Sequence, residues 1–134
     1  MGRWEELNHT ADVAVNVRAE DWEDLLVTAT QAMFGLLAAA GEGPPSDSAT
    51  VTLEAVDQEA LLVDWLNELL YLHERDEIVV VDITFEQLSR TALRARVKGV
   101  PVKEYYTIIK AATFHNLEIE RGDGELQTAI VFDV

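Results

Sequence analysis

Two segments of this chain of 134 residues carry apolar side chains at the spacing of an α-helix, and they constrain the fold most. The second segment has an apolar face made of Leu61, Leu62, Trp65, Leu66, Leu69, Leu70 and Leu72. The first has a similar face made of Trp22, Leu25, Leu26, Ala29, Ala32, Met33, Leu36 and Leu37. A helix with such a wide apolar stripe must lie against another layer of structure.

The ends of both helices are marked in the sequence. Asp57 is a suitable N-cap for the second helix. Asp21 caps the first, and Asp24 three residues later resembles a capping box. We expect the first helix to run through residues 38–40, which are all alanine, with Gly41 as the C′ residue that ends it.

Alternating apolar and polar residues predict the strands that these helices cover. Val13, Val15 and Val17 show the pattern most clearly. The expected strands are residues 4–7, 13–17, 51–55, 78–85, 92–97, 105–119 and 126–134. Turn signals at 89–90 and 121–124 fit hairpins. The economical arrangement is α+β: a two-layer sandwich in one domain, 1–134, with both helices on one face of a mostly antiparallel sheet.

The composition excludes several classes of function. The chain has no cysteine, so disulfides, zinc–thiolate sites and a thiol nucleophile are ruled out. Its net charge of −15 repels phosphate, and its basic residues form no cluster, so we expect no tight binding to nucleic acid. An acidic surface instead suits a cation or a basic protein partner. Without an apolar leader or membrane span, we expect a cytoplasmic protein.

Two groups of polar residues allow more than one interpretation. His9, His73 and His115 are scattered along the chain, so a histidine metal site requires the fold to bring them together. Asp64 and Glu68 lie four residues apart on the side of the second helix opposite its apolar face, which also carries Asn67 and Tyr71. They are either an ordinary solvated face or a contact for a basic partner.

Asp12 and Asp133 form the more informative pair. Asp12 ends a polar segment where a strand begins, and Asp133 follows an apolar strand, where a carboxylate is costly unless it is neutralised. The last residue, Val134, adds a terminal carboxylate. If the two strands are neighbours, oxygens from all three residues converge, and calcium or magnesium prefers such all-oxygen sites. A frayed C-terminus is the alternative.

Several short motifs occur together in a fixed order. They are His9-Thr10-Ala11-Asp12, the helix Asp64-Trp65-Leu66-Asn67-Glu68-Leu69-Leu70-Tyr71, Lys110-Ala111-Ala112-Thr113-Phe114-His115 and the terminal Phe132-Asp133-Val134. As a set, in a chain of this length, they resemble the archease family nearly from end to end. Two departures stand out: Glu104-Tyr105-Tyr106 occupies a segment where the family commonly has a histidine, and Asn116 follows His115 where an aspartate is common.

The resemblance implies a two-layer sandwich and a partner, the tRNA-splicing RNA ligase that uses GTP and manganese. Archease-like proteins promote guanylylation of that ligase and its multiple turnover, without being enzymes themselves. By motif, the family's calcium ligands correspond to Asp12, Asp133 and Val134, and Lys110 corresponds to a position linked to activity. His9, Asp64 and Glu68 are then candidates for partner contact.

Two other functions compete with this interpretation. A general protein chaperone would need an exposed apolar surface. A metal-dependent phosphoesterase built on Asp12 and Asp133 would need an open coordination position and a base, for which only His9 is well placed in the sequence.

Overall fold

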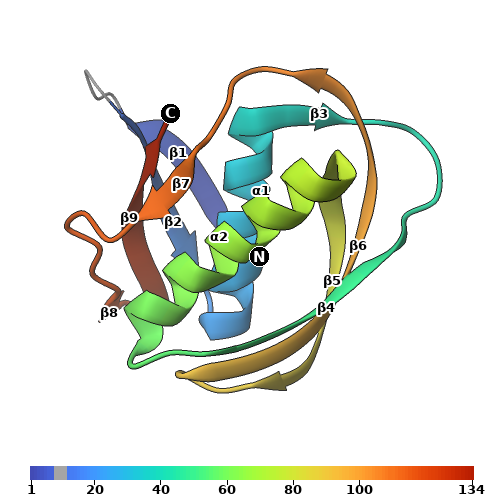
Figure 1. The fold of residues 1–134 in the computed structure, drawn as a ribbon. Coiled ribbons are helices and arrows are strands. Elements are labelled where there is room, and N and C mark those ends of the chain that lie inside the picture. Colours follow the sequence, from blue (N-terminus) through green and yellow to red (C-terminus); the bar gives the residue numbers. More distant parts are fainter. Residues whose placement is uncertain (8–11) are drawn as a thin grey trace.

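The computed structural model describes residues 1–7 and 12–134, which form two helices and nine strands (Figure 1). In chain order the elements are β1 (Arg3–Leu7), β2 (Val13–Ala19), α1 (Trp22–Leu37), β3 (Ala38–Ala40), β4 (Ser46–Glu54), α2 (Gln58–Asp76), β5 (Ile78–Leu88), β6 (Ala92–Tyr105), β7 (Ala111–Thr113), β8 (Glu120–Gly122) and β9 (Glu125–Asp133). The predicted α+β class is confirmed.

The strands are divided between two sheets, where the sequence suggested a single one. In the first, the order is β1-β2-β9-β7, and β8 also pairs with β9. In the second, the long β6 pairs with β3, β4 and β5. Every pairing is antiparallel, as expected from the sequence. The predicted hairpin turns lie between β5 and β6 and between β8 and β9.

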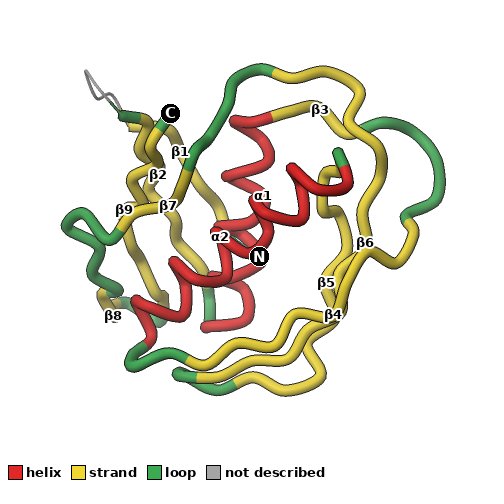
Figure 2. Tube along the Cα trace, in the orientation of Figure 1, coloured by secondary structure: helices red, strands yellow, loops and turns green. Residues whose placement is uncertain are grey.

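Both helices lie between the two sheets, which Figure 2 shows as yellow strands on either side of the red helices. Apolar residues of α1, α2 and both sheets make one continuous core. Trp65 is fully buried in it, and its indole N–H donates a hydrogen bond of 2.9 Å to the Thr30 hydroxyl. Neither helix of the described residues is both long and apolar enough to cross a membrane.

Both predicted helix starts are confirmed, but the predicted end of α1 is wrong. The side chains of Asp21 and Asp57 accept hydrogen bonds from backbone N–H groups in the first turns of α1 and α2. The first helix ends at Leu37, and Ala38 is already extended. Residues 38–40 form β3 because β6 offers them strand partners, and this pairing outweighs the helix propensity of alanine.

The predicted strand over residues 105–119 is also mostly wrong. Apart from Tyr105, which ends β6, only Ala111–Thr113 of this segment is a strand. The backbone N–H groups of Tyr106 and Thr107 both point to the carbonyl oxygen of Leu37, at 2.9 and 3.4 Å. The chain is therefore held against the end of α1 as it crosses from the second sheet to the first.

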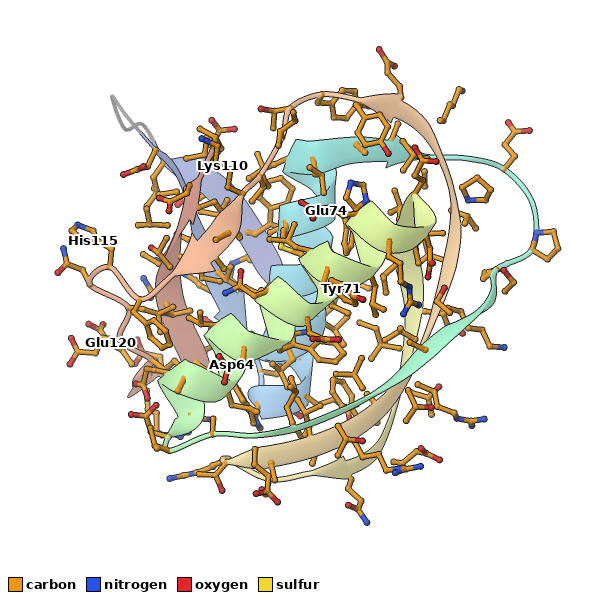
Figure 3. All side chains as sticks on the ribbon, viewed as in Figure 1. Asp64, Tyr71, Glu74, Lys110, His115 and Glu120 are labelled. Atoms are coloured by element: carbon orange, nitrogen blue, oxygen red, sulfur yellow. The ribbon has the colours of Figure 1, made fainter. Side chains whose placement is uncertain are left out.

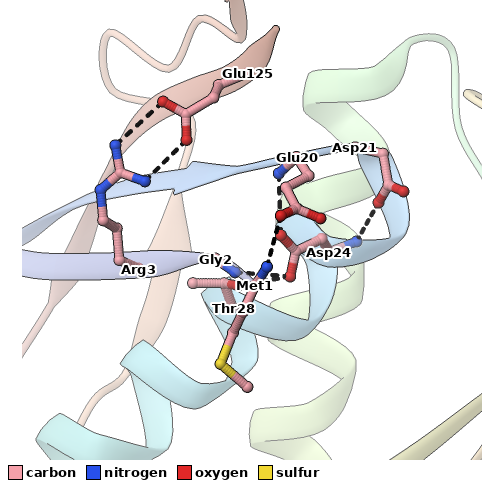
Figure 4. A network of polar contacts seen from close by, with 8 residues as sticks. All are labelled: Met1, Gly2, Arg3, Glu20, Asp21, Asp24, Thr28 and Glu125. Atoms are coloured by element: carbon pink, nitrogen blue, oxygen red, sulfur yellow. Dashed lines mark hydrogen bonds and ion pairs between the residues drawn. The ribbon is translucent and has the colours of Figure 1, made fainter.

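The carboxylate of Asp24 fastens the start of β1 to α1 (Figure 4). It accepts hydrogen bonds of 3.0 Å from the backbone N–H groups of Gly2 and Glu20. The approach is close, since a Cβ on Gly2 would overlap the Thr28 hydroxyl. Asp24 is thus the acceptor that joins the edge of the first sheet to its covering helix.

Replacing Asp24 by alanine is expected to lower the free energy of unfolding by about 2 kcal/mol, because two backbone N–H groups lose their acceptor. Urea denaturation of the two proteins measures the difference. Glu23→Ala is the matched control, because Glu23 is exposed on the same helical turn. Equal losses for both variants would contradict a fastening role for Asp24.

Candidate functional site

The strand register brings Asp12 and Asp133 together at one end of the first sheet. Val13 of β2 pairs with Phe132 of β9. Asp12 precedes Val13 and Asp133 follows Phe132, so both aspartates lie next to this pair, where the paired strands end. Phe132 is buried and Asp133 exposed, so the Asp133 carboxylate lies on the outer side of the sheet.

Lys110 lies at the same end of the sheet, on the side of β9 away from β2, and Val134 is the residue that follows β9. The backbone N–H of Lys110 donates a hydrogen bond of 2.7 Å to the carbonyl oxygen of Asp133. Ala111 pairs with Asp133, so Lys110 comes level with Val134. The Lys110 side chain, labelled in Figure 3, is exposed. It has no ion pair with any residue in 1–7 or 12–134.

Asn67 of α2 holds the strand that follows Lys110. Its side-chain N–H donates to the carbonyl oxygen of Ala112 at 3.1 Å, and its side-chain oxygen accepts from the N–H of Ala112 at 2.8 Å. These two hydrogen bonds give β7 a partner on the helix in addition to its partner β9. Sequence reasoning placed Asn67 on the solvated side of the helix and missed this role. The available signal was an asparagine in mid-helix, where it is a poor helix former.

The oxygen atoms available at this end of the sheet are of the type that hard cations bind. Two carboxylates and main-chain oxygens are the ligands that calcium prefers, and calcium completes its six to eight ligands with water. Within residues 1–7 and 12–134, His, Cys, Asp and Glu form no group of three that could hold a metal ion. A calcium site here therefore needs Asp12 and Asp133 together with oxygens of another kind, such as a main-chain oxygen of Val134.

The other predicted partner residues are not gathered at this point. His9 lies outside the described residues. Asp64 and Glu68 are half-buried on α2 and have no polar partner in the described chain. Figure 3 shows Asp64 on the outward side of α2, away from Lys110.

His73 and His115, the two histidines within the described residues, are not part of any candidate metal cluster. His73 is buried, and its Nδ1 lies 2.7 Å from the carbonyl oxygen of Ile78, so Nδ1 carries the proton and donates. His115 is exposed in the loop after β7. His73 is therefore part of the core and separate from the Asp12–Asp133 pair.

Fold and site together define a small acidic α+β domain with two carboxylates and a lysine at one end of a sheet. The model of the Archease protein family (MTH1598/TM1083) matches residues 4–134. The archease protein of Methanopyrus kandleri is 35% identical over 138 residues, which cover 98% of this chain and 99% of that protein. The chain belongs to the archease family.

Two solved structures are similar over almost the whole chain. The solution structure of protein 1598 from Methanobacterium thermoautotrophicum has a TM-score of 0.77 at 25% identity and covers 98% of both chains. The crystal structure of "an archease, possible chaperone" from Thermotoga maritima has a TM-score of 0.69 at 22% identity, over 97% of this chain and 96% of that one. The first of these supports the same family, and the second supports the fold.

Proposed function

We propose that this protein is a non-enzymatic activator of the cytoplasmic tRNA-splicing RNA ligase, which uses GTP and manganese. It promotes guanylylation of the ligase and lets each ligase molecule turn over many times. The observation that carries the proposal is the convergence of Asp12, Lys110 and Asp133 at one end of the first sheet. These residues come from separate motifs of the family, and only the fold brings them together.

The residues at this end have complementary tasks in the proposed function. Asp12, Asp133 and a main-chain oxygen of Val134 hold calcium, which when bound neutralises the two carboxylates and fixes their positions. Lys110 presents an exposed cation beside them, held in place by the bond from its backbone to Asp133. Together, Lys110 and the calcium-binding residues form a charged surface that contacts the nucleotide or metal site of the ligase.

The net charge supports a protein partner over direct RNA binding. A domain of −15 is attracted to the positive groove that an RNA-binding enzyme must have. The same charge repels the phosphates of tRNA, so the activator itself does not bind tRNA tightly. Its contribution is therefore made through the ligase.

Substoichiometric amounts of this protein are expected to increase both ligase–GMP formation and the number of RNA ends joined per ligase, because an activator is released and reused. The measurement is a multiple-turnover ligation assay with the cognate ligase, with and without the protein. Stimulation that saturates only at one-to-one, in a stable complex, would instead indicate a structural subunit. Suppression of aggregation of an unrelated protein, without ligase stimulation, would favour the chaperone function.

A further inference from the structure

A groove of about 270 Å³ lies where the C-terminal turns of α2 meet the segment that follows β6. Its lining consists of Leu37, His73, Glu74, Glu77, Tyr105, Thr107, Ile108 and Ile109. It is separate from the Asp12–Asp133 pair but joined to it by the chain, because Ile109 of the groove precedes Lys110 of the site. The groove and the site thus share one short segment.

The rim of the groove is apolar and exposed. Ile108 is 72% exposed and Tyr105 is 51% exposed. Nearby on the outward side of α2, Tyr71 is 54% exposed (Figure 3). Large apolar side chains gathered at one place on a surface mark a contact with another molecule, whereas isolated ones need no explanation.

Two carboxylates add a strong charge to this apolar rim. Glu74 and Glu77 line the groove and are exposed, and neither has a hydrogen bond or ion pair through its side chain in the described part of the chain. The neighbouring cation, Arg75, is bound to Asp76 at 2.8 Å and stacks over Tyr71 at 5.7 Å. Arg75 therefore does not pair with Glu74 or Glu77.

The walls of the groove are held before any partner arrives. The His73 ring is fixed by its hydrogen bond to Ile78 and packs edge-on against Phe34 and Tyr105, at centroid distances of 5.8 and 5.6 Å. Opposite, the bonds to Leu37 hold the backbone at 106–107. A preformed groove loses little conformational freedom on binding, which favours a specific contact.

We propose that this groove receives a basic side chain, flanked by apolar residues, from a segment of the RNA ligase. The apolar rim covers the stem and neighbours of that side chain, and the carboxylates of Glu74 and Glu77 pair with its charge. The inference rests on the proposed function and adds the docking surface to it. Because the groove ends at Ile109, docking there fixes where Lys110 and the two aspartates meet the ligase.

The test compares direct binding of the purified ligase to variants at the groove and away from it. Glu74→Lys combined with Glu77→Lys reverses the charge, and Ile108→Ser removes the apolar rim. The matched controls are Glu118→Lys combined with Glu120→Lys for the charge reversal and Val56→Ser for the apolar change, because these residues are exposed and lie outside the groove. Circular dichroism and melting temperature confirm that each variant is folded.

Both groove variants are expected to bind the ligase about tenfold or more weakly, with the control variants unchanged. The salt dependence of binding should also become weaker in the charge-reversed variant. Stimulation should return when its concentration is raised, since the site itself is intact.

The possible outcomes separate the groove from the proposed function. Wild-type affinity for the ligase in the groove variants would overturn the groove proposal and leave the activator function standing. No binding and no stimulation by the wild-type protein would overturn the function itself. If the chain is a dimer in analytical ultracentrifugation and the groove variants are monomers, the occupant is a second copy and the proposal is wrong.

Discussion

Asp12→Asn is expected to reduce stimulation of the ligase to the level without any activator, while the domain stays folded. The substitution keeps the size of the side chain and removes one of two negative charges at the end of the sheet. Calcium affinity depends on the charge of its ligands, so an ion should bind more weakly. The half-buried position of Asp12, just before β2, makes it a minor part of the core.

Two measurements separate this loss from simple unfolding. Multiple-turnover ligation reports stimulation, and the melting temperature with and without calcium reports ion binding, because a ligand that binds only the folded state raises it. Asp133→Asn should behave in the same way, and Asp123→Asn, exposed in the turn between β8 and β9, is the control. Full stimulation by both Asp12→Asn and Asp133→Asn would exclude the carboxylate pair as the site.

Trp65→Ala is expected to have the largest effect on stability, a loss of about 3–5 kcal/mol in the free energy of unfolding. The side chain is fully buried, packs against Phe85 with ring centroids 5.6 Å apart and binds the Thr30 hydroxyl. A domain of this size has a total stability of about 5–15 kcal/mol, so the variant comes close to unfolding. Truncation here leaves a cavity between the helices and the second sheet.

Urea denaturation at equilibrium measures this loss from the transition midpoint and slope. Trp65→Phe should lose less, because most of the apolar volume remains and the Thr30 hydroxyl keeps its bond to the Leu26 carbonyl oxygen. A loss below about 1 kcal/mol in Trp65→Ala would show that the core collapses around the gap.

The local features of the fold could be predicted because they depend on neighbouring residues. The apolar faces of both helices and the caps at Asp21 and Asp57 are set by spacing and by short-range hydrogen bonds. The meeting of Asp12 with Asp133 required only that β2 and β9 be antiparallel neighbours, which the structure confirms.

The features that could not be predicted depend on contacts between distant segments. Residues 38–40 are three alanines, which favour a helix, but they pair with β6 and form a strand. Residues 106–110 are rich in the aromatic and β-branched residues that favour strands, yet Tyr106 and Thr107 bond to Leu37 and the segment is not a strand. Asn67 looked like a surface residue because its partner, Ala112, lies far along the chain. The presence of calcium and the identity of the partner stay predictions.

The two hydrogen bonds between Asn67 and Ala112 have a consequence for local unfolding. β7 has only three residues, and a strand that short at the edge of a sheet would normally fray on its own. Because a helix side chain occupies both polar groups of its central residue, opening β7 requires breaking its attachment to α2 as well as to β9. The Lys110 amide, which bonds to Asp133 directly before this strand, is therefore expected to open together with β7 and its attachment to α2, and more slowly than the preceding loop.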